Sequence, residues 1–515
     1  MYFRMLLTGL ILSTILVVPS AMAQSLEAKL TASDGSANDL FGTSVSISGS
    51  RILVGAFSDD EVAVDAGAIY VFENNGSAWA EAAKLTASSG SEADRLGFDS
   101  FIYGDFAIAG AAFEDHSDQK VDAGAAYIFH FDGTSWAEQA RLTASDSEED
   151  DQFGWTVSIT DSVAVVGSTW DDNYTGAVYV YRYDGSTWTE EAKLTASDSI
   201  EGQRFGGSIH IFNDRIIVGA RFDQDLGSGA GAAYIFKYDG SAWLEEAKLT
   251  ASDGAPGDNF GDAVSIDDDL AIVGASRLNG LIGVSAGGAY VFRYDGATWT
   301  EEAMLLAGDA SGASRFGNSV AIQGNRAFIG AFEEDEIATN AGSAYVFNYD
   351  GTGWVQETKI NESELQTGDG FGNSVAIAGD VVIAGAPNVD LDATSNAGAV
   401  YVYELQPFNP VSVEDAPRAG QVVLHDAYPN PTTGQTTVSF ELAVPGRVVI
   451  EVYDLLGRLI SSVAEDAARS GRTSVTWNGT NLQGELVPSG TYILRLRVDG
   501  SKDLPVDAKT VVVVR

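Results

Sequence analysis

Cysteine is absent from all 515 residues of the chain. Disulfides, thiolate-bound metals, a cysteine nucleophile and a lipid-modified cysteine are therefore excluded. Histidine is also scarce, and His116, His130, His210 and His425 are scattered along the chain. The sequence contains no serine-nucleophile motif, phosphate-binding loop or histidine-rich metal spacing. We therefore predict that the protein is not an enzyme and requires no cofactor.

Basic residues are few. The chain has 29 of them against 73 acidic ones, which gives a formal charge of −44. Such a charge makes nucleic acid and anionic lipid poor partners. An acidic surface of this kind is compatible with adaptation to high salt, where charges are screened within about 3 Å at 1 M. It is equally compatible with binding of cations or cationic surfaces, and the sequence leaves both interpretations open.

Long apolar runs are missing except at the N-terminus. Residues 1–23 contain Arg4, an apolar stretch from Leu6 to Val18, and the small-residue pattern Ala21-Met22-Ala23. The apolar stretch is shorter than the roughly 18 to 20 residues of a membrane span. This pattern predicts a signal peptide over 1–23, a mature chain that begins at Gln24, and no transmembrane anchor.

A motif of about 55 residues occurs seven times in the chain. Each copy contains a Phe-Gly pair followed by a Gly-Ala pair, and steps between copies are 52 to 57 residues. The first pairs are Phe41-Gly42, Leu96-Gly97, Phe153-Gly154, Phe205-Gly206, Phe260-Gly261, Phe316-Gly317 and Phe371-Gly372. Leu96-Gly97 is the degenerate member of the series.

Each copy is predicted to form four antiparallel strands. In the first copy, period-two patterns at residues 43–48, 51–56 and 67–72 are followed by an Asn75-Gly76 turn and a strand from Trp79. Later copies replace Asn-Gly with Asp-Gly, as at Asp184-Gly185, and we expect a tight primed hairpin turn there.

Seven four-stranded units predict an all-β fold, a seven-bladed β-propeller over residues 24–405. The last copy lacks a fourth strand after Tyr403, whereas residues 27–30 repeat the fourth-strand sequence of residues 246–249. We therefore expect the N-terminal strand to complete the last blade and close the ring.

The spacing of Phe260-Gly261 and Gly274-Ala275, repeated in seven copies, resembles the FG-GAP repeat of integrin α-chain propellers and their bacterial relatives. Integrin-type repeats carry a calcium-binding loop between the first two strands. Here that connection is a short turn, such as Ser48-Gly49-Ser50 or Asp267-Asp268-Asp269, which is too short to supply six to eight oxygen ligands. The integrin-type metal site is therefore not expected in this chain.

The longer loops, between strands two and three and between consecutive copies, should share one face of the ring and carry many acidic residues. We call this the long-loop face and expect recognition to take place there. Trp155 and Trp170 also break the repeat pattern of tryptophans, which otherwise lie directly after each hairpin turn, where packing between blades explains them. The candidate ligand-contacting residues are Asp59, Asp60, Asp115, Trp155, Trp170, Asp171, Asp172, Asp223 and Asp225.

One of these loops contains a pattern that is related to calcium-binding loops. Asn388, Asp390, Asp392 and Asn396 place oxygen donors at positions 1, 3, 5 and 9, although Ala393 stands where the turn glycine is expected. These four residues are the candidate metal ligands, and calcium is the possible ion. The alternative is a solvated acidic loop.

The repeat ends at residue 405, and the amino-acid composition changes there. Residues 406–424 contain Pro407, Pro410 and Pro417 and are interpreted as a linker. Residues 425–515 then alternate strands with glycine turns, which predicts a small Ig-like β-sandwich. Their ordered landmarks are Ala427-Tyr428-Pro429-Asn430-Pro431, Gly457-Arg458, Trp477-Asn478-Gly479 and Pro488-Ser489-Gly490-Thr491-Tyr492.

These landmarks resemble the C-terminal sorting domain of the type IX secretion system of Bacteroidetes-like bacteria. The resemblance implies passage across the outer membrane, removal of this domain, and a passenger that is tethered to the surface or released. An Ig-like module that stays attached is the alternative.

Together, these features predict an exported, monomeric recognition or adhesion module at the outer cell surface or outside the cell. Its expected partners are an extracellular protein or a glycan, and the secretion machinery through the C-terminal domain. Three alternatives remain open: a glycan-binding lectin, a secreted polysaccharide-active enzyme, and a structural coat protein without a discrete ligand.

Overall fold

The computed structural model describes residues 24–116, 120–278, 285–309, 312–391 and 394–406 of the N-terminal part. In the C-terminal part it describes residues 422–428, 432, 434–442, 446–454, 458–468, 471–498 and 508–513. The chain divides into two compact units, residues 1–408 and 409–515. The predicted signal peptide and most of the predicted linker lie outside the described residues.

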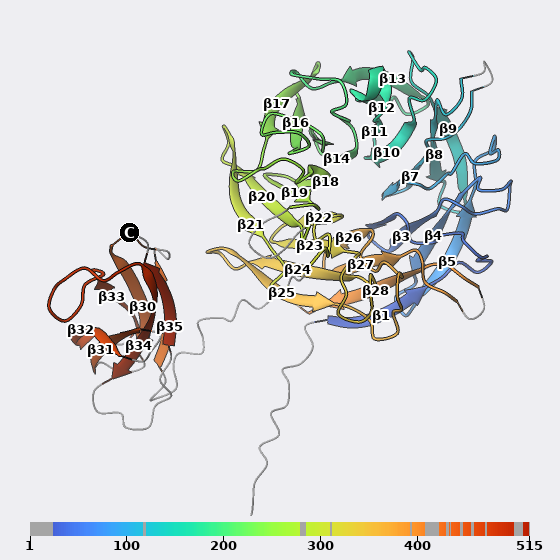
Figure 1. Ribbon diagram of the computed structural model, residues 1–515. Helices are drawn as coiled ribbons and strands as arrows, with labels where there is room; N and C mark the ends of the chain where they lie inside the picture. The colour runs from blue at the N-terminus through green and yellow to red at the C-terminus, as the bar shows by residue number, and fades with distance from the viewer. Residues whose placement is uncertain are drawn as a thin grey trace, which may run out of the picture. The chain divides into compact units, whose positions relative to one another are not determined.

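The first unit consists of seven four-stranded antiparallel sheets arranged in a ring (Figure 1). We number these blades 1 to 7 in chain order. The first strands line the centre and are β2 (Val45–Ser48), β6 (Ser100–Tyr103), β10 (Phe153–Ile159), β14 (Ser208–Phe212), β18 (Phe260–Asp267), β22 (Val320–Gln323) and β26 (Val375–Ala378). The second strands are β3 (Arg51–Ala56), β7 (Phe106–Ala111), β11 (Val163–Ser168), β15 (Arg215–Ala220), β19 (Leu270–Ala275), β23 (Arg326–Ala331) and β27 (Val381–Ala386).

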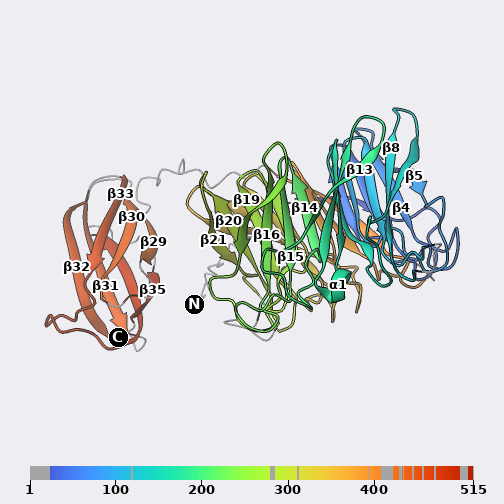
Figure 2. The same cartoon turned by 90° about the horizontal axis from the view of Figure 1, so that it is seen from above.

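The third strands are the most buried: β4 (Ala68–Asn74), β8 (Ala125–Phe131), β12 (Ala177–Tyr183), β16 (Ala232–Tyr238), β20 (Gly288–Tyr294), β24 (Ser343–Tyr349) and β28 (Ala399–Leu405). The outer strands are β5 (Trp79–Leu85), β9 (Trp136–Leu142), β13 (Trp188–Leu194), β17 (Trp243–Leu249), β21 (Trp299–Leu305), β25 (Trp354–Ile360) and β1 (Gln24–Leu30). The short helix α1 (Asp171–Tyr174) lies in the loop between β11 and β12 (Figure 2).

The N-terminal strand completes blade 7, as predicted. β1 pairs antiparallel with β28, with Gln24 opposite Leu405 and Leu30 opposite Val400. The sheet order is therefore β1-β28-β27-β26, and no blade lacks its fourth strand. The predicted seven-bladed propeller, closed by its N-terminal strand, is confirmed.

Glycine explains why the Phe-Gly and Gly-Ala pairs mark each repeat. A Cβ on Gly385, in the Gly-Ala pair of blade 7, would lie 2.0 Å from the carbonyl oxygen of Gly42 in blade 1. A Cβ on Gly398 would lie 2.0 Å from the carbonyl oxygen of Phe41. Gly42 itself has a φ of +96°, a conformation that glycine adopts without steric cost. The same close approaches recur between the other blades, so adjacent blades meet backbone to backbone.

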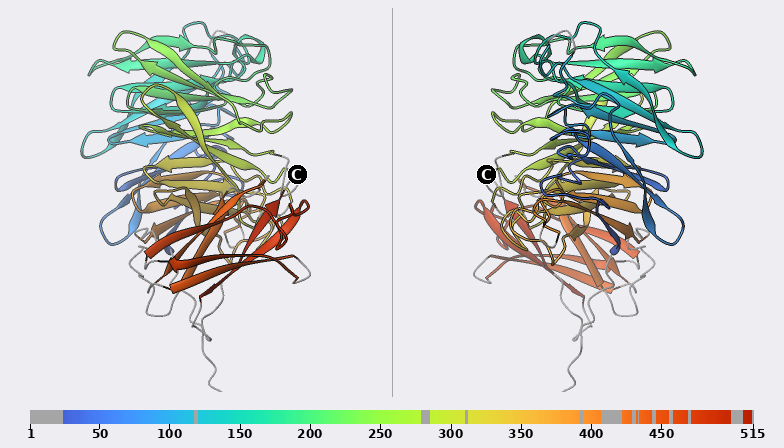
Figure 3. Two further views of the ribbon diagram at one scale, coloured as in Figure 1. Left: turned by 90° about the vertical axis from the view of Figure 1, so that its left-hand side faces the viewer. Right: turned by 90° about the vertical axis from the view of Figure 1, so that its right-hand side faces the viewer.

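Hydrogen bonds also run from blade to blade around the centre. The Ser46 hydroxyl of blade 1 accepts the Ile102 amide at 3.0 Å. Between blades 7 and 1, the Ser374 hydroxyl accepts the Val45 amide at 3.0 Å, and this bond closes the circle. Side chains of one inner strand thus satisfy amides of the next, which would otherwise form an unpaired strand edge. Figure 3 shows the blades following one another around the ring from two sides.

The repeated aromatic side chains pack as predicted. Phe260 of the Phe-Gly pair is 1% exposed and packs against Tyr290 and Phe292 of its own blade at centroid distances of 5.4 and 6.0 Å. Some outer-strand tryptophans also bridge blades by hydrogen bonds: the Trp299 indole donates to Glu246 of the preceding blade at 2.9 Å, and the Trp188 indole donates to Gln139 at 2.9 Å.

The hairpins between third and fourth strands are tight, but they have one left-handed residue where two were expected. In the connection between β12 and β13, the Asp184 amide donates to the Thr187 carbonyl at 3.2 Å, and only Gly185 has a positive φ, of 94°. The Asp184 carboxylate accepts the amides of Ser186 and Thr187 at 2.8 Å. The aspartate side chain therefore holds the turn, and a second left-handed residue is unnecessary.

The second unit contains two packed sheets, as the predicted sandwich requires. Their strands are β29 (Val422–Tyr428), β30 (Thr436–Leu442) and β33 (Gly471–Trp477) in one sheet, and β32 (Leu459–Ala468), β31 (Gly446–Asp454), β34 (Gly490–Val498) and β35 (Ala508–Val513) in the other. Trp477 is buried beside Tyr492 at 5.6 Å, and the Tyr492 hydroxyl donates to the Pro488 carbonyl at 2.9 Å. Two of the sequence landmarks of this region therefore meet in the core.

We predict that Gly385→Ala lowers the free energy of unfolding by about 3 kcal/mol, because its methyl group would overlap the Gly42 carbonyl. The matched control is Gly353→Ala, where an added Cβ meets nothing within 4 Å. Its effect should stay within about 0.5 kcal/mol. Urea unfolding of the two variants provides the measurement, and equal stabilities would contradict backbone contact at the ring closure.

Candidate functional site on the long-loop face

The acidic loops of the long-loop face are organised around repeated basic side chains. At the second-to-last position of the outer strand, the blades carry Lys84, Arg141, Lys193, Lys248, Met304, Lys359 and, in blade 7, Lys29. Each basic side chain in this series pairs with acidic residues of the neighbouring loops. This arrangement was not predicted from the sequence, although the Glu-Ala-Lys-Leu sequence that recurs in the outer strands indicates a repeated lysine at this position.

Blade 4 illustrates the arrangement in detail. The Lys248 ammonium lies 2.6 Å from Asp198, 2.9 Å from Asp223 and 2.6 Å from Asp225. The Tyr234 hydroxyl donates to Asp198 at 2.7 Å and to Asp223 at 3.0 Å. Burial alone would lower the pKa of the Lys248 ammonium, but its hydrogen bonds to the three carboxylates outweigh burial and raise that pKa. The lysine therefore stays charged and neutralises the loop.

Several of the predicted ligand-contacting acids belong to these networks. Asp59, Asp171 and Asp223 are each 3% exposed, and each accepts hydrogen bonds from a buried tyrosine and pairs with a lysine. Their charge is satisfied inside the protein. Asp60, Asp115, Asp172 and Asp225 are exposed in the same loops. Asp60 and Asp115 accept backbone amides of their own loops at 2.8 and 3.0 Å.

Among the described residues, two acidic groups lie close enough to hold a metal ion: Asp198, Asp223 and Asp225 in one, and Asp309, Glu334 and Glu336 in the other. In each group a lysine ammonium lies among the carboxylates. Lys359 is 2.7 Å from Asp309, 3.1 Å from Glu334 and 2.6 Å from Glu336. The lysine already supplies the positive charge that a cation would bring.

The candidate calcium loop lies beside a cavity of about 550 Å³ that is lined by Asn388, Asp390 and Asn396. Its side chains already have hydrogen bonds within the fold. Asn388 donates to the Gly368 carbonyl at 3.0 Å, Asp390 accepts the Asn396 amide at 2.8 Å, and the Asn396 side chain donates to Asn38 at 3.0 Å. Asp392 lies outside the described residues. A calcium ion in this loop therefore stays a prediction.

Trp155 lies at the centre of an aromatic group on the long-loop side of the ring. Its ring is 4.7 Å from Phe98 and 6.3 Å from Phe113, and Phe98 is 5.5 Å from Phe57. The Arg95 guanidinium lies 4.6 Å from Phe113 and 5.8 Å from Phe57. All five side chains are half-buried. We call this set the Trp155 cluster.

Trp170 belongs to a second group of the same kind, which includes Tyr174 at 5.1 Å. The Arg204 guanidinium lies 5.7 Å from Trp170, 6.0 Å from Tyr174 and 5.1 Å from Phe222. We call this set the Trp170 cluster. Sequence reasoning found both tryptophans, but it did not associate them with Arg95 and Arg204.

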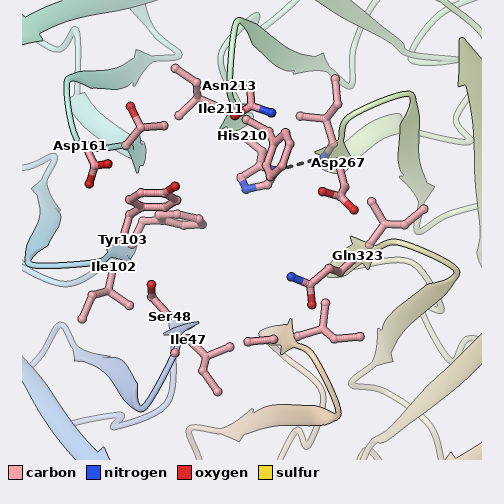
Figure 4. Close-up of a pocket in the computed structure, with 18 of the residues that line it drawn as sticks. Ile47, Ser48, Ile102, Tyr103, Asp161, His210, Ile211, Asn213, Asp267 and Gln323 are labelled. Atoms are coloured by element: carbon pink, nitrogen blue, oxygen red, sulfur yellow. Dashed lines mark hydrogen bonds between the residues drawn. The ribbon is translucent and has the colours of Figure 1, made fainter. Parts of the chain in front are cut away.

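A channel runs along the inner strands of the ring. It consists of cavities of about 430 and 340 Å³ that share Ile47, Phe101 and His210, and the second of them also reaches Phe98 and Trp155. Figure 4 shows the end at the short turns, where Tyr103, Asp161, His210, Asp267 and Gln323 border a common opening.

Two titratable groups inside the channel are unusual. His210 accepts the Ile266 amide at 3.0 Å, and burial lowers its pKa to about 4, so the imidazole is neutral at pH 7. Asp99 accepts the amides of Val157 and Ser100 at 2.8 and 3.0 Å. Burial nevertheless raises its pKa to about 7. His210 thus adds no charge to the channel at pH 7, whereas Asp99 changes its charge near that pH. Both side chains accept backbone amides of a neighbouring blade.

Four-stranded blades in a closed seven-membered ring, with long loops on one face, define a β-propeller scaffold. Comparison with known families matches the FG-GAP repeat at residues 25–72, 79–129, 136–181, 188–236, 243–292, 299–347 and 354–403. The chain belongs to the FG-GAP repeat family, whose members are typical of extracellular adhesion and recognition proteins. Residues 411–501 match the FlgD Ig-like domain. A search of curated proteins finds no match. Among the described residues, no helix has the length and apolar character needed to cross a membrane.

We predict that Lys248→Met destabilises the propeller by about 2 kcal/mol, because it leaves the buried Asp223 beside two further carboxylates without a counter-charge. Methionine fits this place, since Met304 occupies it in blade 5. The control is Lys237→Met, whose ion pairs are both 3.9 Å long and whose own side chain is 39% exposed. Losing these pairs should cost under about 0.5 kcal/mol. Equal thermal midpoints for the two variants would argue against a structural role for the lysine.

Proposed function

We propose that this protein is an exported extracellular recognition module that acts in adhesion and binds its ligand on the long-loop face. The observation that carries this proposal is the asymmetry of that face. At the position directly after the Phe-Gly or Leu-Gly pair, the seven blades carry Thr43, Phe98, Trp155, Gly207, Asp262, Asn318 and Asn373. Large aromatic residues occur there only in blades 2 and 3.

A residue with a structural role in the ring should recur in nearly every blade. The positions of Phe260 and Trp299 recur in this manner. Trp155 and Phe98 occupy a position that is aromatic in two blades only. Phe57 and Phe113, which lie in the loops after the second strands, have aromatic counterparts in three other blades. All four rings remain half-buried at a surface. Half-exposed aromatic side chains beside arginine have the composition of binding surfaces. Family membership supports the same conclusion, because FG-GAP repeats are typical of extracellular adhesion proteins.

Export is the second part of the proposal. Residues 1–23 have the sequence of a signal peptide, and the lack of cysteine excludes a lipid anchor at the processing site. The C-terminal sandwich, which matches the FlgD Ig-like domain, would act as a sorting domain for a type IX secretion system and then be removed. Its landmarks resemble that class of domain, and the passenger would end on the outer surface or outside the cell.

We expect the chain from Gln24 to Arg515 to bind selected members of an array of extracellular proteins and glycans. Trp155→Ala and Trp170→Ala should each weaken that binding about tenfold, because each change removes a ring from the surface. Leu244→Ala, an exposed change on the outer strand β17, is the control and should leave binding unchanged.

The array is run once with calcium and once with a chelator. This comparison separates ligand binding that needs a cation from ligand binding that does not. Loss of binding in chelator would place a cation in the ligand contact. Uniform silence on the array under both conditions would overturn the recognition proposal and favour a coat protein or a polysaccharide-active enzyme.

A separate experiment tests sorting. In a bacterium that has a type IX secretion system, the full chain should reach the cell surface without its C-terminal domain, whereas a chain that ends at residue 424 should stay in the periplasm. Surface proteolysis and immunoblotting report both outcomes. Surface display of the truncated chain, or a full chain that keeps the domain, would contradict the sorting role.

A further inference from the structure

Most basic side chains of the propeller form ion pairs with acidic residues, as a chain with a charge of −44 would suggest. The paired ones are Lys29, Arg51, Lys84, Arg141, Arg182, Lys193, Arg215, Arg221, Lys237, Lys248, Arg293, Arg315, Arg326 and Lys359. Arg95 and Arg204 differ from them. Within the described part of the chain, neither of these two guanidinium groups forms an ion pair or a side-chain hydrogen bond.

Arg95 and Arg204 hold the same place in the repeat, directly before the Leu-Gly pair of blade 2 and the Phe-Gly pair of blade 4. Both have a left-handed backbone, with φ of 60° and 55°. Arg315, directly before the Phe-Gly pair of blade 6, has a φ of 56°, but its guanidinium pairs with Glu333 at 3.3 Å. Two of three equivalent arginines therefore form no ion pair among the described residues. Asp122, whose pKa is raised by burial, is near enough to Arg95 for the guanidinium charge to oppose that rise.

Aromatic rings partly remove both guanidinium groups from water. Arg95 lies over Phe113 and beside Phe57, and its Nε atom is buried without a hydrogen-bond partner. Arg204 lies against Phe222 and Trp170. The pKa of Arg204 is lowered, first by burial and then by the nearby Arg221. Leaving a charged donor half-desolvated and unpaired costs free energy, which an anionic ligand would recover.

We propose that Arg95 and Arg204 bind the anionic groups of an acidic polysaccharide, while Trp155 and Trp170 contact its sugar rings. This inference rests on the proposed recognition function and names the class of ligand. Planar guanidinium groups pair with carboxylates and sulfates through two parallel hydrogen bonds. Each arginine lies in a cluster with one tryptophan whose ring can contact the apolar face of a pyranose.

A polysaccharide fits these features better than an acidic protein. The two arginines occupy equivalent positions in blades 2 and 4, whereas Trp155 and Trp170 come from different repeat positions. The face therefore carries two places of similar composition, each with one arginine and one tryptophan. A polymer of repeating acidic sugars presents an anionic group and a ring in each unit, and this matches an arginine and a tryptophan in each cluster. The acidic loops around the clusters would disfavour polyanions in general, and contacts at these two places would select the ligand.

The test uses the chain from Gln24 to Arg515 and four immobilised probes: polygalacturonate, dextran sulfate, neutral dextran and poly-glutamate. We expect binding to polygalacturonate or dextran sulfate, weakened by salt because charges are screened. Arg95→Gln and Arg204→Gln should each weaken it about tenfold, the usual size of a lost charged hydrogen bond. Arg95→Lys and Arg204→Lys keep the charge and should restore part of the affinity.

Arg315→Gln is the matched control, because it changes the same repeat position in a blade whose arginine is already paired. Its binding should stay within twofold of the unchanged chain. A thermal melt of every variant separates loss of binding from loss of fold.

Binding that is equal in all three glutamine variants would overturn the inference, and so would a lack of preference for the acidic polymers over neutral dextran. Binding to poly-glutamate alone would replace the polysaccharide with an acidic protein. If the array described above finds a ligand whose binding does not depend on either arginine, this inference fails while the recognition function stands. If the protein binds neither a member of the array nor any of the four polymers, both this inference and the recognition function fail.

Discussion

Adjacent blades of this propeller approach each other through their backbones, and the rest of the architecture depends on that approach. A Cβ at the Gly-Ala glycine of blade 7 would lie 2.0 Å from a carbonyl oxygen of blade 1, and similar distances recur around the ring. Such distances exclude any side chain. Because glycine is required at each interface, the motif repeats with the blades. Hydrogen bonds such as that between Ser374 and Val45 then join the inner strands across these interfaces.

The ring determines where charge can be placed. Each blade brings an outer-strand residue and a buried tyrosine close to two acidic loops, and in blade 4 the result is the group of Lys248, Tyr234, Asp198 and Asp223. Much of the acidity on the long-loop face is therefore structural, since a lysine and a tyrosine neutralise or hydrogen-bond it internally. The acids that remain exposed, such as Asp60 and Asp115, surround these networks.

Function is best sought where the sevenfold pattern is interrupted. The Trp155 and Trp170 clusters occupy neighbouring blades and contain arginines without a carboxylate partner among the described residues. A symmetric scaffold with a local asymmetric patch allows one ligand to be bound in one orientation. The closed ring supports the patch, because the loops that carry it begin and end on strands fixed by the blade interfaces.

Much of the fold could be predicted from the sequence because its determinants are local and repeated. Period-two strands, the Phe-Gly and Gly-Ala pairs, and the fourth-strand text at the N-terminus indicated seven blades and their closure. The Asp-Gly hairpins are tight, as predicted, but of the expected pair only Gly185 is left-handed, because the Asp184 side chain holds the turn by accepting two amides. Trp155 and Trp170 could be selected because they depart from a pattern that the sequence itself displays.

Which side chains meet across the repeat depends on how the loops and outer strands are placed by folding. Asp59, Asp171 and Asp223 seemed open to a ligand in the sequence, but folding buries them against lysines and tyrosines that are 8 to 25 positions away. Arg95 resembles Arg315 by position, yet Arg95 lies among aromatic rings and Arg315 lies against Glu333. The repeat, the ring and its closure follow from the amino-acid sequence alone, because backbone packing depends on residues at fixed spacing. The pairing of charges depends on which outer-strand lysine meets which loop carboxylate, and the repeated Glu-Ala-Lys-Leu sequence marks the lysines without naming their partners.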